Sequence, residues 1–329
     1  LFSKVSVLQR TFMSDLYPII DLHEDLLFHM NRRDLFPDGK WQTNPDMIRN
    51  NKLKLVVATA FPVPLNENFF DLSVNEMIEH GFDSYSDLVK KEKWAIIQTA
   101  SDVDRALKPD GSVGLLLHIE GLNVVDNQSW DQFERWYEKG WRSLGIVWNL
   151  SNPLGGGAND SAQGLTQLGV DVIQWCQNKK MVVDLAHMNE QTFWDSTKII
   201  DKPLYVSHGN CRSLCDSPRN YSDDQLRAIA KTGGVIGIFF AKTYVTGREK
   251  PATIKDVVAH IQHARKITSD DNIALGTDLG GIIHGFPDGL GSLNSLSTLF
   301  KALLDEGWTE EMLEKLCYKN AARVLKTYL

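Results

Sequence analysis

Short, almost wholly apolar runs alternate with longer amphipathic stretches along nearly all of this 329-residue chain. Apolar runs of this length, rich in Val, Ile and Leu, are typical of strands that are buried on both faces of a sheet. Eight such strands are predicted: Tyr17–Leu22, Leu55–Ala60, Val113–Ile119, Ser143–Trp148, Met181–Ala186, Leu204–Ser207, Val235–Phe240 and Ile273–Thr277.

The stretches between and after these runs show helical spacing, and Ser222 with Gln225 forms a capping-box pair before one of them. Strands that alternate with helices indicate a parallel sheet with helical crossovers. The predicted helices are Leu72–Lys91, Trp130–Lys139, Leu165–Lys179, Glu190–Ile199, Asp223–Lys231, Ile254–Ile267, Leu293–Glu306 and Glu310–Tyr328.

Eight such strand-and-helix units are the number found in a closed (β/α)8 barrel, so we predict an α/β chain folded as a TIM-like barrel. A doubly wound open sheet is the alternative, because spacing alone does not show whether a sheet closes. The run Trp94–Ile97 falls outside the eightfold count and predicts a strand within an insertion. Because no linker marks a boundary, we expect residues 1–329 to form one barrel domain with insertions after the first and second strands.

The charge balance argues against several classes of partner. With 35 Lys and Arg against 42 Asp and Glu, and no basic run, the chain is not expected to bind nucleic acid or an anionic membrane surface. The longest apolar stretch, residues 55–65, is shorter than the roughly 20 residues that span a bilayer, so no membrane anchor is expected. Residues 1–20 include Lys4, Arg10 and Asp15 without a sustained apolar region, which is unlike a secretory signal.

The cysteine content predicts a reducing compartment. Four cysteines are too few for a disulfide framework in a chain of this length, and none forms a CxxC pair. We therefore expect a cytoplasmic protein with buried thiols. Cys211 and Cys215, four residues apart and close to His208, leave a thiolate metal site as an alternative interpretation.

Metal-competent side chains follow five of the eight predicted strands. In a barrel the carboxyl ends of all strands open onto one face, so residues far apart in sequence become neighbours there. Imidazole and carboxylate groups are suitable ligands for Zn²⁺ or a similar divalent ion, and six of them exceed one tetrahedral site. Two metals that share a bridging carboxylate are therefore predicted. The six predicted ligands are His23, Asp25, Glu120, His187, His208 and Asp278.

With these residues in place, the sequence resembles the membrane dipeptidases, also called renal dipeptidases or peptidase family M19, within the amidohydrolase superfamily of metal-dependent barrels. The resemblance runs from about residue 17 to the end of the chain. The segments that carry it are "IIDLHEDLL", "LLLHIEGL", "VVDLAHMN", "VSHGNCRSLCDSPRN" and "IALGTDLGG".

The resemblance assigns roles to individual residues. It places the family's HxD motif on His23 and Asp25, the bridging glutamate on Glu120 and two further ligand histidines on His187 and His208. It also places the aspartate after the last strand on Asp278 and a substrate-binding arginine on Arg219. A pocket-lining position of the family corresponds to Tyr244.

Two positions depart from the family pattern and bear on the substrate. Trp148, followed by Asn149, stands where well-described dipeptidases carry a histidine that steadies the tetrahedral intermediate. Gly280 replaces the second aspartate of the usual DFDG ending. Since the indole of Trp148 offers one N–H donor and no acceptor, we expect it to line the substrate pocket in a different way.

Other chemically suggestive residues are expected to be structural. His260 and His263 lie within a predicted helix, and His118 precedes Glu120 within a strand. The run Gly155–Gly157 lacks the GK[ST] of a phosphate-binding loop and predicts a flexible loop beside the site.

These features together predict a zinc-dependent dipeptidase with two Zn²⁺ ions per chain. A hydroxide bridging the metals would attack the amide bond of a dipeptide, with Glu120 and Asp278 as catalytic residues. Arg219 would hold the free carboxylate of the substrate, whose C-terminal residue could be a D-residue. A related hydrolase of another small amide, lactam or lactone, and a metal-retaining binding protein, are the alternatives. The oligomeric state is left open, with a homodimer as one option.

Overall fold

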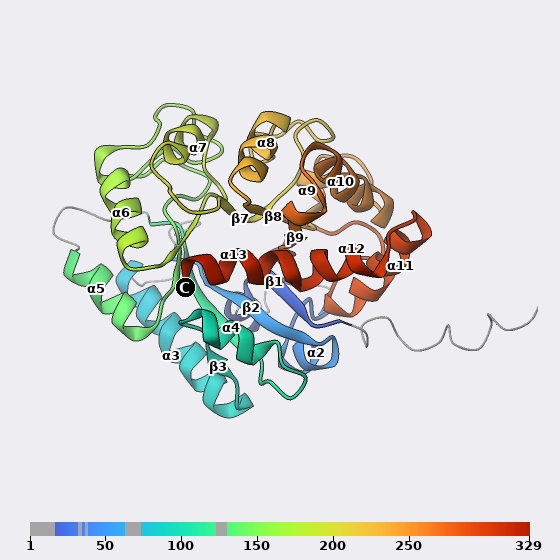
Figure 1. Cartoon of the computed structure of the whole chain (residues 1–329), viewed down its shortest axis with the longest axis horizontal. Coiled ribbons are helices and arrows are strands. Elements are labelled where there is room, and N and C mark those ends of the chain that lie inside the picture. Colours follow the sequence, from blue (N-terminus) through green and yellow to red (C-terminus); the bar gives the residue numbers. More distant parts are fainter. Residues whose placement is uncertain (1–16, 32–34, 37–38, 63–73, 123–129) are drawn as a thin grey trace, which may run out of the picture.

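Figure 1 shows the computed structural model, which describes residues 17–31, 35–36, 39–62, 74–122 and 130–329. Its strands form one parallel sheet in the order β2-β1-β9-β8-β7-β6-β5-β4-β3, and β2 also pairs with β4. The strands are β1 (Ile19–Glu24), β2 (Leu53–Ala60), β3 (Ala95–Ile96), β4 (Gly114–Glu120), β5 (Ser143–Gly145), β6 (Val182–Asp184), β7 (Tyr205–Gly209), β8 (Val235–Ile238) and β9 (Ile273–Leu275).

The sheet closes on itself. Asp21 of β1 pairs with Leu275 of β9, and residues 55–60 of β2 pair with residues 114–119 of β4. A ring of eight strands results, so the chain is a TIM-like barrel and the open-sheet alternative is wrong. The extra strand β3 pairs only with the start of β4, at Gly114 and Leu115, which agrees with the prediction of an additional strand at Trp94–Ile97.

Helices surround the barrel (Figure 1). Several follow the predicted bounds closely, and the capping box of Ser222 and Gln225 opens α8. The helices are α1 (Leu26–Asn31), α2 (Pro45–Asn50), α3 (Val74–Glu92), α4 (Ala100–Ala106), α5 (Trp130–Lys139), α6 (Gln167–Asn178), α7 (Glu190–Thr197), α8 (Asp223–Lys231), α9 (Lys242–Val245), α10 (Ile254–Ile267), α11 (Leu296–Asp305), α12 (Glu310–Glu314) and α13 (Asn320–Tyr328). The structure also describes two 3₁₀ turns, η3 (Asp270–Asn272) and η4 (Leu293–Ser295), and a π-helical turn, η5 (Lys315–Lys319).

Some predicted bounds differ from the structure. The short helices α1, α2, α4 and α9 were not predicted, although Asn44 before Pro45 and the capping box of Thr99 with Asp102 mark the starts of α2 and α4. The predicted helix start at Leu72 lies outside the described residues, as do Lys4, Arg10 and Asp15. His23, Glu120 and His208 lie inside β1, β4 and β7 rather than after them.

The core has two parts because residues along each strand alternate between the two faces of the barrel wall. Outward-facing residues pack against the surrounding helices. Inward-facing Ile20, Leu22 and Leu55 pack in one cluster with Leu325 and Tyr328 of α13. The C-terminal helix therefore closes one end of the barrel interior, and Figure 1 shows it lying across the strands. Among the described residues, none of the helices combines the length and apolar character needed to cross a bilayer.

Candidate metal centre

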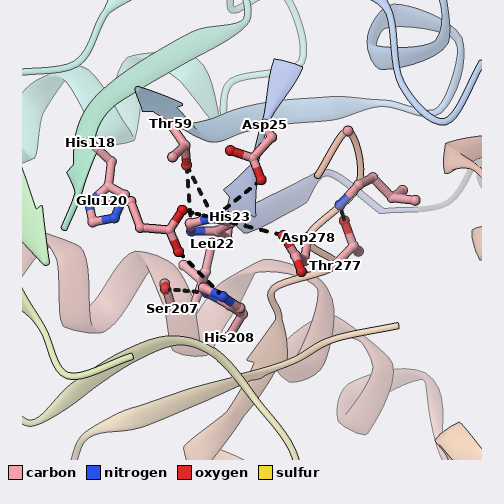
Figure 2. Close-up of polar contacts among 12 residues, drawn as sticks. Leu22, His23, Asp25, Thr59, His118, Glu120, Ser207, His208, Thr277 and Asp278 are labelled. Carbon is pink, nitrogen blue, oxygen red and sulfur yellow. Dashed lines mark hydrogen bonds and ion pairs between the residues drawn. The ribbon is translucent and has the colours of Figure 1, made fainter. Parts of the chain in front are cut away.

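The six predicted metal ligands come together at the carboxyl ends of the strands. His23 and Glu120 project from β1 and β4, and His208 projects from β7. Asp25, His187 and Asp278 lie in the segments that follow β1, β6 and β9. Figure 2 shows five of them converging, with the Glu120 carboxylate between His23 and His208.

Glu120 occupies the centre of the cluster. Its Oε2 lies 3.4 Å from Nε2 of His23, while its Oε1 lies 2.9 Å from Nε2 of His187 and 3.7 Å from Nε2 of His208. The two carboxylate oxygens thus face two different groups of side chains. Both groups, His23–Asp25–Glu120 and Glu120–His187–His208, have their ligand atoms within 4.8 Å of one another.

Asp25 and Asp278 complete the first group. Asp25 Oδ2 lies 3.7 Å and Asp278 Oδ1 lies 4.0 Å from Nε2 of His23. Burial and the nearby Asp25 carboxylate raise the pKa of Asp278 well above its ordinary value. Two carboxyl groups, the buried Asp25 and the partly exposed Asp278, therefore adjoin a third, Glu120. Within the described part of the chain, all three form ion pairs with histidines only.

This set of donors fits divalent metal ions. Burial and then the guanidinium of Arg219 lower the pKa of His187 to about 4, so its imidazole is neutral at physiological pH. Burial and then His23 lower the pKa of His208 well below its ordinary value. Neutral imidazoles and ionised carboxylates are the forms that bind metals, and a bound cation would offset the crowded negative charge.

A third geometric group, His23–Asp184–His208, is a poorer candidate. Oδ1 of Asp184 already accepts hydrogen bonds from the backbone N–H groups of Ala186, at 3.0 Å, and Ser207, at 2.9 Å. Asp184 therefore fixes the backbone from which His208 projects. Sequence reasoning missed this residue, whose only signal is a carboxylate inside an apolar strand.

Two ligand residues adopt an uncommon backbone conformation. The φ angles of His187 and Asp278 are 64° and 61°, in the left-handed region that residues with a Cβ rarely occupy. Such conformations cost of the order of 1–3 kcal/mol and cluster at functional sites. Here they turn each side chain back into the barrel mouth directly after a strand.

The structure explains why position 280 is a glycine. Its φ angle is 96°, and a Cβ on this backbone would lie 2.6 Å from the carbonyl oxygen of Asp25. An aspartate at this position is therefore incompatible with the local backbone. The departure from the DFDG ending lets the segment after β9 approach the ligand Asp25.

The group of six predicted ligands opens into a cavity of about 320 Å³. Arg219, Trp148 and Tyr244 all line it, as the resemblance implied. The ring of Trp148 lies 5.8 Å from that of His187, and Tyr244 stacks on Phe239 at 5.4 Å. Arg248 and His284 also line the cavity, although no motif marked either of them in the sequence.

Arg219 is almost fully buried in the wall of this cavity, with 2% of its surface exposed. Its Nη2 donates to the carbonyl oxygen of His208 at 3.1 Å. Its Nε and Nη1 have no hydrogen-bond partner among the described residues. Buried donors without partners are costly, so this guanidinium has room for an anionic group of a ligand.

The remaining suggestive residues have structural roles. His260 accepts from the backbone N–H of Cys211 at 3.1 Å, while its other nitrogen lies 2.9 Å from the carbonyl oxygen of Val245. Within the described chain, no candidate metal group includes a cysteine. The expected flexible loop at Gly155–Gly157 is closely packed, since a Cβ on Gly157 would lie 2.1 Å from the carbonyl oxygen of Trp148.

Comparisons with known proteins show which family this chain resembles. The model of the family "Membrane dipeptidase (Peptidase family M19)" matches residues 9–328. An uncharacterized Klebsiella pneumoniae protein from the pqqA 5' region is 36% identical over 69% of this chain and 86% of its own length. An uncharacterized dipeptidase of Schizosaccharomyces pombe is 29% identical over 70% of this chain and 56% of its own length.

A solved structure shares the fold. The crystal structure of a Rhodobacter sphaeroides metallopeptidase, bound to a phosphinate mimic of the dipeptide L-Ala-D-Ala, superposes with a TM-score of 0.84 at 22% identity. The match covers 95% of this chain and 99% of that one. The match of the family model to nearly the whole chain shows that the protein belongs to the membrane dipeptidase family, peptidase family M19, whose members are metal-dependent dipeptidases.

Proposed function

We propose that the protein hydrolyses the amide bond of dipeptides with two zinc ions bound, and that it accepts a D-residue at the C-terminal position. The observation that carries the two-metal proposal is the position of Glu120, whose two oxygens face separate groups of ligands. The ligand of the Rhodobacter sphaeroides metallopeptidase, a mimic of L-Ala-D-Ala, supports the stereochemical part.

Each metal would have its own protein ligands. His23, Asp25 and Asp278 would hold one ion, and His187 and His208 would hold the other, with Glu120 shared between them. When bound, divalent metals of this kind supply a water whose pKa is lowered from ~15.7 toward ~7 and polarise the scissile carbonyl.

Asp278 would move the proton during the reaction. As the water oxygen bonds to the carbonyl carbon, the π electrons of the carbonyl shift to its oxygen, and Asp278 accepts the proton that the water loses. When the C–N bond breaks, Asp278 returns this proton to the nitrogen of the leaving amine.

Arg219 would position the substrate. Its two unpartnered donors suit the free carboxylate of a short peptide, which would place the scissile bond above the ligand cluster. A cavity of about 320 Å³ is within the range of small-ligand sites, roughly 300–1,000 Å³. Longer peptides would have to carry their carboxylate out of this enclosed position.

The alternative substrate is another small amide, a lactam or a lactone, and Trp148 and Gly280 are the residues that favour it. Purified protein reconstituted with zinc should be analysed for metal content and tested on L,L- and L,D-dipeptides alongside lactams and lactones. We expect two zinc equivalents and turnover of dipeptides. Turnover of lactones alone would support the alternative, and one zinc equivalent would contradict the two-metal proposal. A cytoplasmic location and a homodimer stay predictions.

A further inference from the structure

The two groups of ligands differ strongly in charge. The first contains two carboxylates of its own, Asp25 and Asp278, in addition to the shared Glu120. The second contains two neutral imidazoles and only the shared carboxylate. Because opposite charges attract strongly in a buried site, the first group should retain a divalent cation more tightly.

A fixed cation adjoins the second group. The guanidinium of Arg219 donates to the backbone carbonyl of His208 at 3.1 Å and is almost fully buried. Its positive charge therefore lies beside the backbone of His208 and would repel a metal ion held by His187 and His208.

The hydrogen-bond partners of the two histidines in the second group are also uncharged. Oδ1 of Asn149 lies 2.9 Å from Nδ1 of His187, and Oγ of Ser207 lies 2.8 Å from Nδ1 of His208. An amide oxygen only accepts hydrogen bonds, so Nδ1 of His187 carries the proton and Nε2 presents its lone pair toward Glu120. A carboxylate behind a ligating histidine would make it more basic, and among the described residues none occupies either position.

Asn149 is well placed to orient His187. It lies in the segment that follows β5, and its backbone carbonyl accepts from the N–H of Asn159 at 2.8 Å. His187 itself occupies an uncommon conformation in the turn after β6. The hydrogen bond therefore joins two separate loops and fixes the ring that the strained turn presents.

We propose that the two metal positions are unequal, that the ion held by His187 and His208 is released first, and that Asn149 is the positioning residue that sets its affinity. The inference rests on the proposed two-metal function. It concerns affinity for the metal rather than the rate of hydrolysis, so it is tested by metal release.

The experiment is a chelator titration of the zinc-loaded protein, followed by measurement of the zinc that remains per chain. The cobalt-substituted protein, followed by visible absorbance, reports the ligand environment in parallel. The wild type should lose its ions in two separate steps. In Asn149→Ala the zinc affinity of the weaker step should fall by roughly 10–100-fold, the usual effect of losing such a partner. The affinity of the tighter step should not change. The unchanged tighter step also shows that the variant is folded.

Two further variants sharpen the test. Asn149→Asp keeps the acceptor oxygen and adds a charge, so its weaker step should return to the wild-type affinity or exceed it. Asn159→Ala removes a nearby cavity-lining amide whose contact with Asn149 is made by its backbone, so both steps should stay near those of the wild type.

The outcomes separate the inference from the proposed function. A wild type that binds a single zinc ion contradicts the two-metal proposal itself. Two steps in the wild type that are both unmoved in Asn149→Ala overturn the role of Asn149 and leave the dipeptidase proposal intact. Weakening of both steps together, or failure of Asn149→Asp to restore the weaker one, would reveal a general structural role and likewise overturn the inference.

Discussion

The proposed function gives Asp278 two roles, metal binding and proton transfer, and one substitution can separate the two. Asn at this position still offers a carbonyl oxygen to a metal but cannot accept and return a proton. General acid–base catalysis contributes roughly 10²–10⁴ in rate, so kcat of Asp278→Asn should fall at least about a hundredfold while at least one metal is retained. The measurement is kcat together with metal content on the same preparation. A metal-replete variant with near wild-type turnover would exclude the proton-transfer role.

Arg219 should affect substrate binding more than the chemical step. A guanidinium forms a forked pair of hydrogen bonds with a carboxylate, which the single ammonium of lysine does not reproduce. Because this contact is made to a non-reacting group in both the ground state and the transition state, Arg219→Lys should raise KM for dipeptides more than it lowers kcat. An unchanged KM across the dipeptide panel would remove Arg219 from the substrate site.

The sequence was sufficient to predict which side chains gather at the barrel mouth. Imidazoles and carboxylates stand out where they follow apolar runs, and a barrel brings the ends of its strands together. The sequence was not sufficient to predict the hydrogen-bond partners of those side chains. Asn149 and Asp184 act through hydrogen bonds to residues more than 20 positions away, and such pairs depend on the folded geometry.

At the level of elements, long amphipathic helices were easier to predict than short ones. The helix α5 has the predicted bounds, because its apolar residues recur with helical spacing over three turns. Four-residue α9 offers too few residues for such a pattern, yet it carries Tyr244 into the cavity. Strand ends were misjudged where a polar ligand continues the strand, as with His23 in β1.

The helix α13 gives a prediction at the same scale, because it closes the barrel end remote from the metal centre. Leu325 is fully buried in the cluster that includes Ile20 and Leu22. Leu325→Ala should lower the free energy of unfolding by about 2–5 kcal/mol, from lost apolar contact and the cavity left behind. Chemical denaturation measures this loss. Thr327→Ala on the exposed side of the same helix should change stability by no more than about 0.5 kcal/mol.

Zinc affinity provides the control for the Leu325→Ala prediction in α13. Because α13 packs at the end of the barrel away from the ligands, Leu325→Ala should bind zinc as the wild type does wherever it is folded. A destabilised variant that also loses zinc under folding conditions would show that the two ends of the barrel are coupled.

At the scale of the whole molecule, closure of the barrel encloses polar groups as well as apolar ones. His118 faces the interior one layer from Glu120, since alternate residues of a strand share a face. Its Nδ1 lies 2.8 Å from Oγ of Ser143, and its ring lies 5.6 Å from that of His23. The sequence indicated a structural histidine but not its place beneath the metal centre, which follows only from the register of β4 with β5.

This buried histidine should make the stability of the metal-free protein depend on pH. Burial, partly offset by Asp184, lowers the pKa of His118 from 6.5 to about 4. Between those values the unfolded chain binds a proton at this residue and the folded chain does not, so its contribution to stability is lost as the pH falls. At about 1.4 kcal/mol per pH unit, the loss from neutral pH to about pH 4 amounts to roughly 3 kcal/mol.

His118→Gln isolates this contribution from those of the other buried ionisable groups. Glutamine retains hydrogen-bonding capacity but does not titrate, so the variant lacks the proton that unfolding takes up at this residue. With chelator present, the free energy of unfolding should therefore fall less steeply in the variant than in the wild type as the pH is lowered from 6.5 to 4. Denaturant titrations across that range give the two slopes. Parallel slopes would mean that His118 is protonated equally in the folded and unfolded chains, and that the barrel interior beneath the metal centre is accessible to protons and water.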